Sequence, residues 1–230
     1  MTVFAIAGGK GGCGKTTTTL GLAGALAREG ENPLVVDADP DMPDVHHRVS
    51  VARTPGIDAL ASGRPLSDVV QSSTDLPGVG ILTAGRRGHL DAALRAVEQW
   101  EGPVLVDCAA GTSPDAVRPF RHADCSVVVS TDSPDCLADA ETTRAVARRF
   151  GAPPAGVVLR ERDTRSTGTE PPHWQVLARS PTVDRPLSDP RVREALTAVA
   201  NTVRAIASSP TRRRGTLPLS ESKRSKPTPD

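Results

Sequence analysis

The chain has 230 residues, and its 28 Lys and Arg residues nearly balance its 27 Asp and Glu residues, so the formal net charge is only +1. This length suits one well-buried domain, and no stretch approaches the roughly eighteen apolar residues that a membrane-spanning helix needs. The chain passes from Met1 into a glycine-rich loop without a basic leader, so no signal peptide is expected. These features predict a soluble, cytoplasmic protein.

The charge is distributed unevenly along the chain. Residues 211–230 hold six Lys or Arg and two acidic residues, a net charge of +4, which leaves residues 1–210 with a net charge of −3. We expect residues 1–207 to form the folded domain and residues 208–230 to form a basic, Pro/Ser-rich disordered tail, because the tail has too few apolar residues for a core. A purely solvating tail is favoured, and electrostatic contact with DNA or another anionic surface is the alternative.

Short apolar runs alternate with helical periodicity, which is typical of a parallel sheet covered by helices. Strands are predicted at 3–7, 33–37, 78–84, 103–107, 126–131 and 155–160, with a further short strand possible at 175–178. Longer helices are predicted at 16–28, 90–100, 134–150 and from 190 onward, and short helical pieces at 56–61 and 65–71. Ser188 or Asp189 is expected to cap the last helix, and Pro190 suits its first turn.

A glycine-rich loop carries the clearest functional signal. Residues 9–16 fit G-x-x-x-x-G-K-[ST], a loop whose backbone N–H groups cradle phosphates at the start of a helix. Lys15 would reach the β- and γ-phosphates, and the Thr16 hydroxyl would hold Mg²⁺. The loop follows a predicted strand and opens a predicted helix, as this motif requires. The expected nucleotide-binding residues are Gly9, Lys10, Gly11, Gly12, Cys13, Gly14, Lys15, Thr16 and Thr17.

The loop KGGCGKTT also contains a second lysine, Lys10, and so resembles the deviant Walker A loop KGGxGK[ST] of the MinD/ParA family of P-loop ATPases. Four later segments are similar to that family's strand 2 with switch I, its "lPaG" strand, its Walker B strand with switch II, and its final helix: VVDADPDMPDV (35–45), LTAG (82–85), VLVDCAAG (104–111) and SDPRVREAL (188–196). The resemblance covers residues 1–206. It implies an α/β P-loop NTPase fold, a mainly parallel sheet with helices on both faces in a single domain, and ATP and Mg²⁺ as cofactors.

The resemblance also implies roles for individual residues. In that family the extra lysine reaches across a nucleotide-sandwich homodimer to the phosphates of the other subunit, which would be the role of Lys10. Lys10, Lys15 and Asp39 would act in hydrolysis, with Asp39 positioning the attacking water. Thr16, Asp37 and Asp107 would hold Mg²⁺, with Asp107 in the outer coordination sphere. Both Asp37 and Asp107 close a predicted strand beside the loop.

The chain departs from the family at three places. It is closest to MinD-like members, yet no amphipathic helix can be built beyond Ile206, so membrane binding is not expected. The family's adenine-recognising Asn-Arg pair is Leu159 and Arg160 here, so a preference for ATP over GTP rests on the resemblance alone. His46 and His47 replace residues that are usually apolar in MinD, and we expect them to be exposed loop histidines, with switch-region contacts as the alternative.

The resemblance implies an ATP-driven dimerisation switch that hydrolyses ATP slowly and positions a cargo in cell division, chromosome partitioning or surface machinery through an unidentified partner. One alternative is a non-catalytic nucleotide-sensing scaffold or DNA-binding adaptor, although the intact set of lysines and aspartates argues against lost catalysis. Another is an iron–sulfur carrier, which would need exposed cysteines at the dimer axis. Cys13, Cys108, Cys125 and Cys136 form no CxxC pair and are expected to be small, partly buried thiols.

Overall fold

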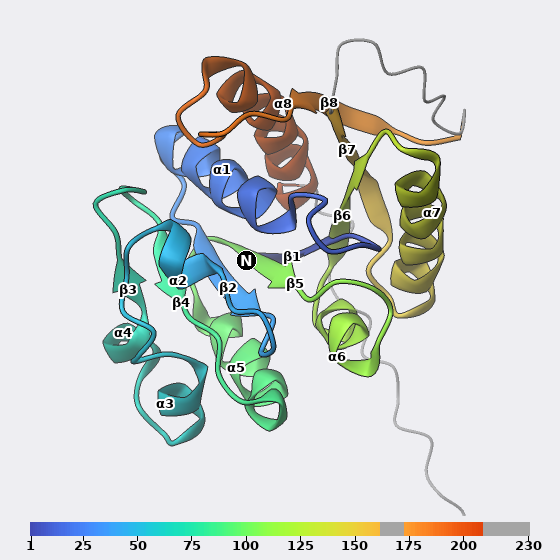
Figure 1. Cartoon of the computed structure of the whole chain (residues 1–230). Helices are drawn as coiled ribbons and strands as arrows, with labels where there is room; N and C mark the ends of the chain where they lie inside the picture. The colour runs from blue at the N-terminus through green and yellow to red at the C-terminus, as the bar shows by residue number, and fades with distance from the viewer. Residues whose placement is uncertain (162–172, 209–230) are drawn as a thin grey trace, which may run out of the picture.

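The computed structural model of the chain describes residues 1–161 and 173–208. Its centre is an eight-stranded sheet in the order β3-β4-β2-β5-β1-β6-β7-β8, covered by helices on both faces (Figure 1). Neighbouring strands pair in parallel, except for the antiparallel pair β3–β4. The predicted α/β class with a mainly parallel sheet is therefore confirmed. The predicted tail, apart from Ser208, lies outside the described residues.

The strands are β1 (Thr2–Ala7), β2 (Leu34–Ala38), β3 (Gln71–Ser72), β4 (Gly80–Leu82), β5 (Pro103–Cys108), β6 (Cys125–Thr131), β7 (Pro154–Glu161) and β8 (Val176–Pro181). The α-helices are α1 (Lys15–Arg28), α2 (Val45–Arg48), α3 (Ile57–Ala61), α4 (Leu66–Val69), α5 (Leu90–Ala96), α6 (Pro114–Val117), α7 (Pro134–Arg149) and α8 (Pro190–Ala207). Three 3₁₀ turns complete the described part: η1 (Arg87–His89), η2 (Val97–Gln99) and η3 (Arg118–Arg121).

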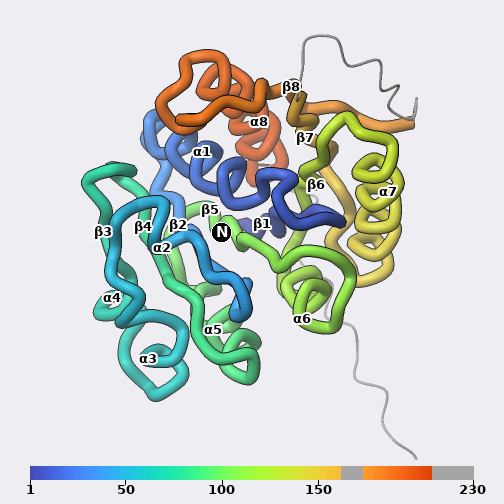
Figure 2. The backbone as a smooth tube through the Cα atoms, in the orientation of Figure 1, coloured from blue at the N-terminus to red at the C-terminus, as the bar shows by residue number. Residues whose placement is uncertain are grey.

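The central strands are buried on both faces, which is why they appear in the sequence as continuous apolar runs. On β1, Phe4 and Ile6 face the core beneath α1 and α8, whereas Val3 and Ala5 face the opposite core beneath α5. Figures 1 and 2 show α1 and α8 together on one side of the sheet and α5 and α6 on the other. This arrangement leaves the carboxyl ends of β1, β2 and β5 beside one another.

The last helix is built as the sequence predicts. The Asp189 carboxylate accepts hydrogen bonds from the N–H groups of Arg191 (2.8 Å) and Val192 (3.4 Å), so Asp189 is the N-cap, and Pro190 occupies the first turn. The apolar stripe of α8 is buried at Val192, Leu196, Val199 and Val203. Leu196 packs onto α1 at Gly21, where an added Cβ would lie 2.3 Å from its Cδ1 atom.

Most predicted elements are present, and the differences concern short ones. The structure adds β3, α2 and α6, which contain two to four residues and are too short to show a period. The strand expected at 78–84 is only three residues long, and the one suggested at 175–178 extends to Pro181. Within the described part of the chain, no helix combines the length and the apolar character needed to cross a membrane.

Candidate nucleotide-binding site

The glycine-rich loop connects the end of β1 to the first residue of α1. Gly14 precedes the helix in the left-handed conformation (φ 98°), and no side chain caps the first turn. The first N–H groups of α1 are therefore available to an anion, and the helix dipole favours negative charge there. No atom lies within 4 Å of the place where a Cβ would stand on Gly11 or Gly12, and both residues are exposed, so this part of the loop is open to solvent.

Three parts of the fold hold this loop in place. A Cβ added to Gly9 would lie 2.4 Å from Cβ of Asp139 on α7, and one added to Gly14 would lie 2.4 Å from Nη1 of Arg160 on β7. The Gly111 N–H, which follows β5, donates to the Gly8 carbonyl at 3.2 Å. Glycine is therefore needed at position 9 for close approach to the α7 backbone, and at position 14 for the left-handed conformation (φ 98°).

The two lysines of the loop have opposite environments. Lys15 is only 9% exposed. Burial raises the pKa values of Cys13 and Asp107, and the charge of Lys15 partly opposes that rise. Lys10 is exposed on the outer turn, and it makes no ion pair or hydrogen bond with residues 1–161 or 173–208. The fold thus directs one lysine into the protein's own site and leaves the other on the surface.

Two carboxylates stand together at the ends of β2 and β5. Asp37 and Asp107 are register partners across the two strands, and they are 1% and 3% exposed. Asp37 accepts hydrogen bonds from the N–H groups of Asp39 (3.1 Å) and Val45 (3.3 Å), and Asp107 accepts one from the Thr19 hydroxyl (3.0 Å). Burial, followed by the charge of Asp107, raises the pKa of Asp37 to about 7. Burial also raises the pKa of Asp107 to about 6, opposed by hydrogen bonds from Thr16 and Thr19.

This pair of carboxylates suits a cation. Two buried carboxyl groups with raised pKa values, next to the hydroxyl of Thr16, are oxygen ligands of the kind that Mg²⁺ uses together with substrate phosphates. Among the described residues, no group of three or more His, Cys, Asp or Glu side chains could hold a metal without other ligands. The two carboxylates and the Thr16 hydroxyl are a donor set that fits Mg²⁺ bound together with a nucleotide.

The raised pKa of Asp37 predicts a pH-dependent stability in the metal-free protein. Its pKa rises from 3.8 to about 7 on folding, so its contribution to the free energy of unfolding is fully present below pH 3.8 and is lost as the pH rises through about 7. We compare the Tm of Asp37→Asn with that of wild type in EDTA without nucleotide. The Tm of the variant minus that of wild type should be higher at pH 8 than at pH 5, by at least about 3 °C. A Tm difference from wild type that is the same at both pH values would contradict the burial cost assigned to Asp37.

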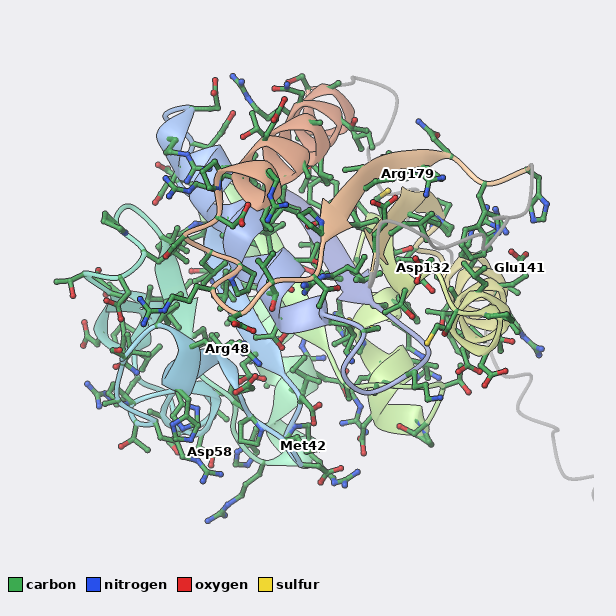
Figure 3. All side chains as sticks on the ribbon, turned by 45° about the horizontal axis from the view of Figure 1, so that its top comes forward. Met42, Arg48, Asp58, Asp132, Glu141 and Arg179 are labelled. Carbon is green, nitrogen blue, oxygen red and sulfur yellow. The ribbon has the colours of Figure 1, made fainter. Side chains whose placement is uncertain are left out.

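Asp39 lies in the loop after β2, residues 39–44, called the switch I loop below. One carboxylate oxygen, Oδ1, accepts hydrogen bonds from the N–H groups of Asp41 (3.2 Å) and Met42 (3.0 Å). Its Oδ2 oxygen has no hydrogen bond to any residue in the described ranges. Met42, labelled in Figure 3, is 78% exposed, which is unusual for a large apolar side chain. The loop therefore presents a free carboxylate oxygen and an exposed apolar side chain.

Comparison with known proteins identifies the family. Residues 4–179 match the model of the CobQ/CobB/MinD/ParA nucleotide binding domain. The chain belongs to this family. An uncharacterized ATP-binding protein of Methanocaldococcus jannaschii is 29% identical over 203 residues, covering 84% of this chain and 76% of the relative. The chromosome partitioning protein ParA of Caulobacter vibrioides is 35% identical over 144 residues, so the match spans about half of each chain (54% and 54%).

Solved structures agree with this assignment of the fold. The septum site-determining protein MinD of Pyrococcus horikoshii, complexed with Mg-ADP, superposes with a TM-score of 0.77 at 24% identity, covering 90% of this chain and 97% of the other. The P-loop NTPase fold in a single domain and the resemblance to MinD/ParA proteins are thus confirmed. The expected cofactors, ATP and Mg²⁺, are consistent with the family.

The structure brings the predicted site residues together and corrects one expectation. Residues 9–17 form the cradle, with Asp37, Asp39 and Asp107 at its edge. His46 is not an exposed loop histidine, because it is buried in the short helix α2, and its Nδ1 atom has no hydrogen-bond partner among the described residues. Only His47 is exposed, as expected.

Three of the four cysteines are buried. Cys13, Cys108 and Cys125 are buried and Cys136 is partly exposed, so the four cysteines offer no exposed pair for an iron–sulfur cluster.

Leu159 and Arg160 occupy the place of the family's adenine-recognising Asn-Arg pair. Leu159 is buried in the core, whereas Arg160 points to the loop and its Nε atom is buried without a hydrogen-bond partner in the described ranges. Sequence reasoning did not identify Arg160 as a support of the loop, since that contact depends on the pairing of distant strands.

Proposed function

We propose that this protein is a Mg-ATP-dependent dimerisation switch that hydrolyses ATP slowly to ADP and phosphate. The observation that carries the proposal is the open, uncapped loop at the start of α1, which lies beside the buried pair Asp37 and Asp107. Membership of a nucleotide-binding family supports it.

In this proposal, different residues of the site bind the phosphates, bind Mg²⁺ and position the attacking water. The N–H groups of the loop bind the phosphates, and Lys15 neutralises charge on the β- and γ-phosphates from its buried position. Bound Mg²⁺ would supply further positive charge to the phosphate oxygens, held by Thr16, Asp37 and, in its outer sphere, Asp107. Asp39 holds the attacking water at its free oxygen, because Oδ1 is occupied by its own loop.

The proposal includes a homodimer in the ATP-bound state. Lys10 is exposed and has no partner within the described residues, so it is free to reach phosphates held by a second copy of the chain. A cation that a partner supplies to a phosphoryl-transfer site raises the rate by roughly 10³–10⁵ in known cases. The exposed Met42 lies on the switch I loop and would be covered by the same contact.

The cellular role follows from the relatives. Matching proteins include a chromosome partitioning protein and a septum site-determining protein. By analogy, this chain acts in the cytoplasm and positions a cargo through a partner protein that recognises its ATP-bound dimer.

The proposed activity is tested by phosphate release from the purified full-length chain. We expect slow turnover with Mg-ATP, none in EDTA, and slower turnover with Mg-GTP. Tight ATP binding with no phosphate release under any condition would instead favour the nucleotide-sensing scaffold.

The basic tail provides a separate prediction. If residues 211–230 contact DNA, their removal should leave ATP hydrolysis unchanged and weaken DNA retention most at low salt, since six Lys or Arg residues release counterions on binding. DNA retention and its salt dependence, compared between the full-length and truncated chains, provide the measurement. Unchanged retention would assign the tail to solubility.

A further inference from the structure

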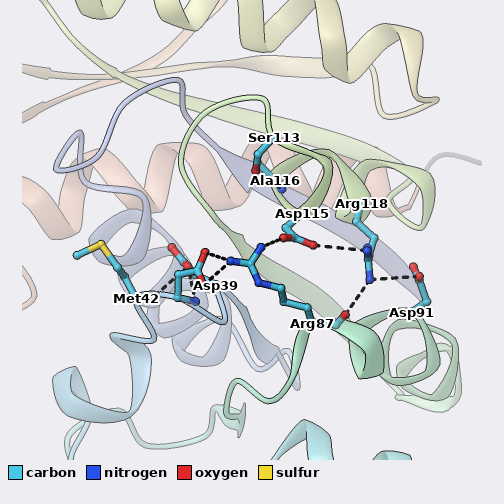
Figure 4. Close-up of polar contacts among 9 residues, drawn as sticks. Asp39, Met42, Arg87, Asp91, Ser113, Asp115, Ala116 and Arg118 are labelled. Atoms are coloured by element: carbon cyan, nitrogen blue, oxygen red, sulfur yellow. Dashed lines mark hydrogen bonds and ion pairs between the residues drawn. The ribbon is translucent and has the colours of Figure 1, made fainter.

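Arg87 lies between two segments that border the nucleotide site. It belongs to the turn η1 after β4, and its guanidinium contacts carboxylates on both sides (Figure 4). Nη2 donates to both oxygens of Asp41 at 2.5 Å, and Nη1 contacts Asp115. Asp41 is in the switch I loop, and Asp115 is in α6, just after β5 and the glycine that touches the phosphate loop. One arginine therefore joins the switch I loop to α6.

Through Asp41, Arg87 is connected to Asp39, the proposed catalytic carboxylate. The Asp41 N–H donates to Oδ1 of Asp39 at 3.2 Å, and the N–H of Met42 donates to the same oxygen at 3.0 Å. Holding the Asp41 side chain therefore restrains the two N–H groups that orient Asp39. The backbone of Asp39 is itself held by Asp37, because the Asp39 N–H donates to Oδ1 of Asp37 at 3.1 Å.

The other side of the contact is braced by Arg118. Its Nη1 donates to the Arg87 carbonyl at 2.7 Å, and its Nη2 lies 3.4 Å from Oδ1 of Asp115. Asp115 is only 14% exposed, so this carboxylate is a firmer support than Asp41, which is 61% exposed. The contact of Arg87 with α6 is therefore more buried than its contact with the switch I loop.

We propose that Arg87 is a positioning residue for ATP hydrolysis, which holds the switch I loop against α6 so that Asp39 is oriented toward the attacking water. The inference rests on the proposed function for its effect on turnover. The Arg87 side chain is 54% exposed, and ion pairs at exposed sites add little to stability, so the role of Arg87 lies in loop geometry rather than in the stability of the fold. A small displacement of Asp39 is sufficient to slow the chemical step.

The test compares Arg87→Ala with wild type in the full-length chain. We expect kcat for ATP hydrolysis to fall about tenfold, with ATP affinity within about twofold of wild type and Tm unchanged. Hydrogen exchange at the Asp41 and Met42 amides, measured without nucleotide, should become several-fold faster. The exchange measurement does not need turnover, so an inactive wild-type chain would refute the proposed function and still leave Arg87 tested.

The neighbouring Arg86 provides the matched control. Its side chain is 83% exposed, lies 3.9 Å from Asp58 and makes no ion pair with Asp41 or Asp115 among the described residues, so Arg86→Ala should change neither kcat nor the exchange at Asp41 and Met42. Asp41→Asn combined with Arg87→Ala should be no slower than Arg87→Ala alone, because both act through one contact. Unchanged kcat and unchanged exchange in Arg87→Ala, or fully additive effects in the double variant, would overturn the proposal.

Discussion

Lys15→Ala is expected to reduce ATP hydrolysis by at least about 10²-fold and to weaken ATP binding strongly. Lys15 is the buried cation of the phosphate loop, next to the two carboxylates that burial already penalises. On the proposed function, removing it takes away the positive charge that balances the β- and γ-phosphates, and water cannot replace that charge in a buried position. Nucleotide binding is measured by calorimetry, and hydrolysis by phosphate release.

The control for this variant is Arg28→Ala, which removes an exposed cation from the other end of the same helix. It should bind and hydrolyse ATP like wild type. Circular dichroism separates a folding defect from a loss of binding. Turnover at the wild-type rate in folded Lys15→Ala protein would refute the assignment of the phosphate loop.

Asp39→Ala is expected to reduce hydrolysis by roughly 10²–10³-fold while ATP affinity stays close to that of wild type. The free Oδ2 oxygen of Asp39 lies in the switch I loop and makes no contact on which the cradle of residues 9–17 depends. The variant should therefore accumulate in its ATP-bound form. Single-turnover hydrolysis and equilibrium ATP binding, measured on the same preparation, separate the two effects.

Asp39→Asn is the matched comparison, since an amide oxygen can still accept the N–H groups of Asp41 and Met42. If Asp39 acts on water through its second oxygen, Asn should be as inactive as Ala. If its only role is to shape the loop, Asn should recover most of the wild-type turnover, and that recovery would contradict the proposed catalytic role.

Much of the site could be predicted from the sequence because its residues occupy fixed places in a local pattern. The loop from Gly9 to Thr16 follows a buried strand and begins a helix, and Asp37 and Asp107 close strands of the same sheet. Parallel strands bring their carboxyl ends to one edge, so the pattern alone predicts that these groups meet.

The contacts that support the site could not be predicted in this way. Arg87 meets Asp41 and Asp115 only because the turn after β4, the switch I loop and α6 come together in the fold. His46 was expected to be exposed, and that prediction was wrong because a helix of four residues is too short to show its buried face in the sequence. Pairwise contacts between distant segments carry no sequence period.

The central claim is that Lys10 acts on the nucleotide of a second subunit, and the most direct measurement is the light-scattering mass of Asp39→Ala protein in Mg-ATP and in Mg-ADP. The same two masses are measured for Asp39→Ala combined with Lys10→Ala. The account predicts a dimer with Mg-ATP, a monomer with Mg-ADP, and a monomer in both states once Lys10 is removed. A monomer of Asp39→Ala in both nucleotides, or an ATP-dependent dimer that survives the loss of Lys10, would contradict it.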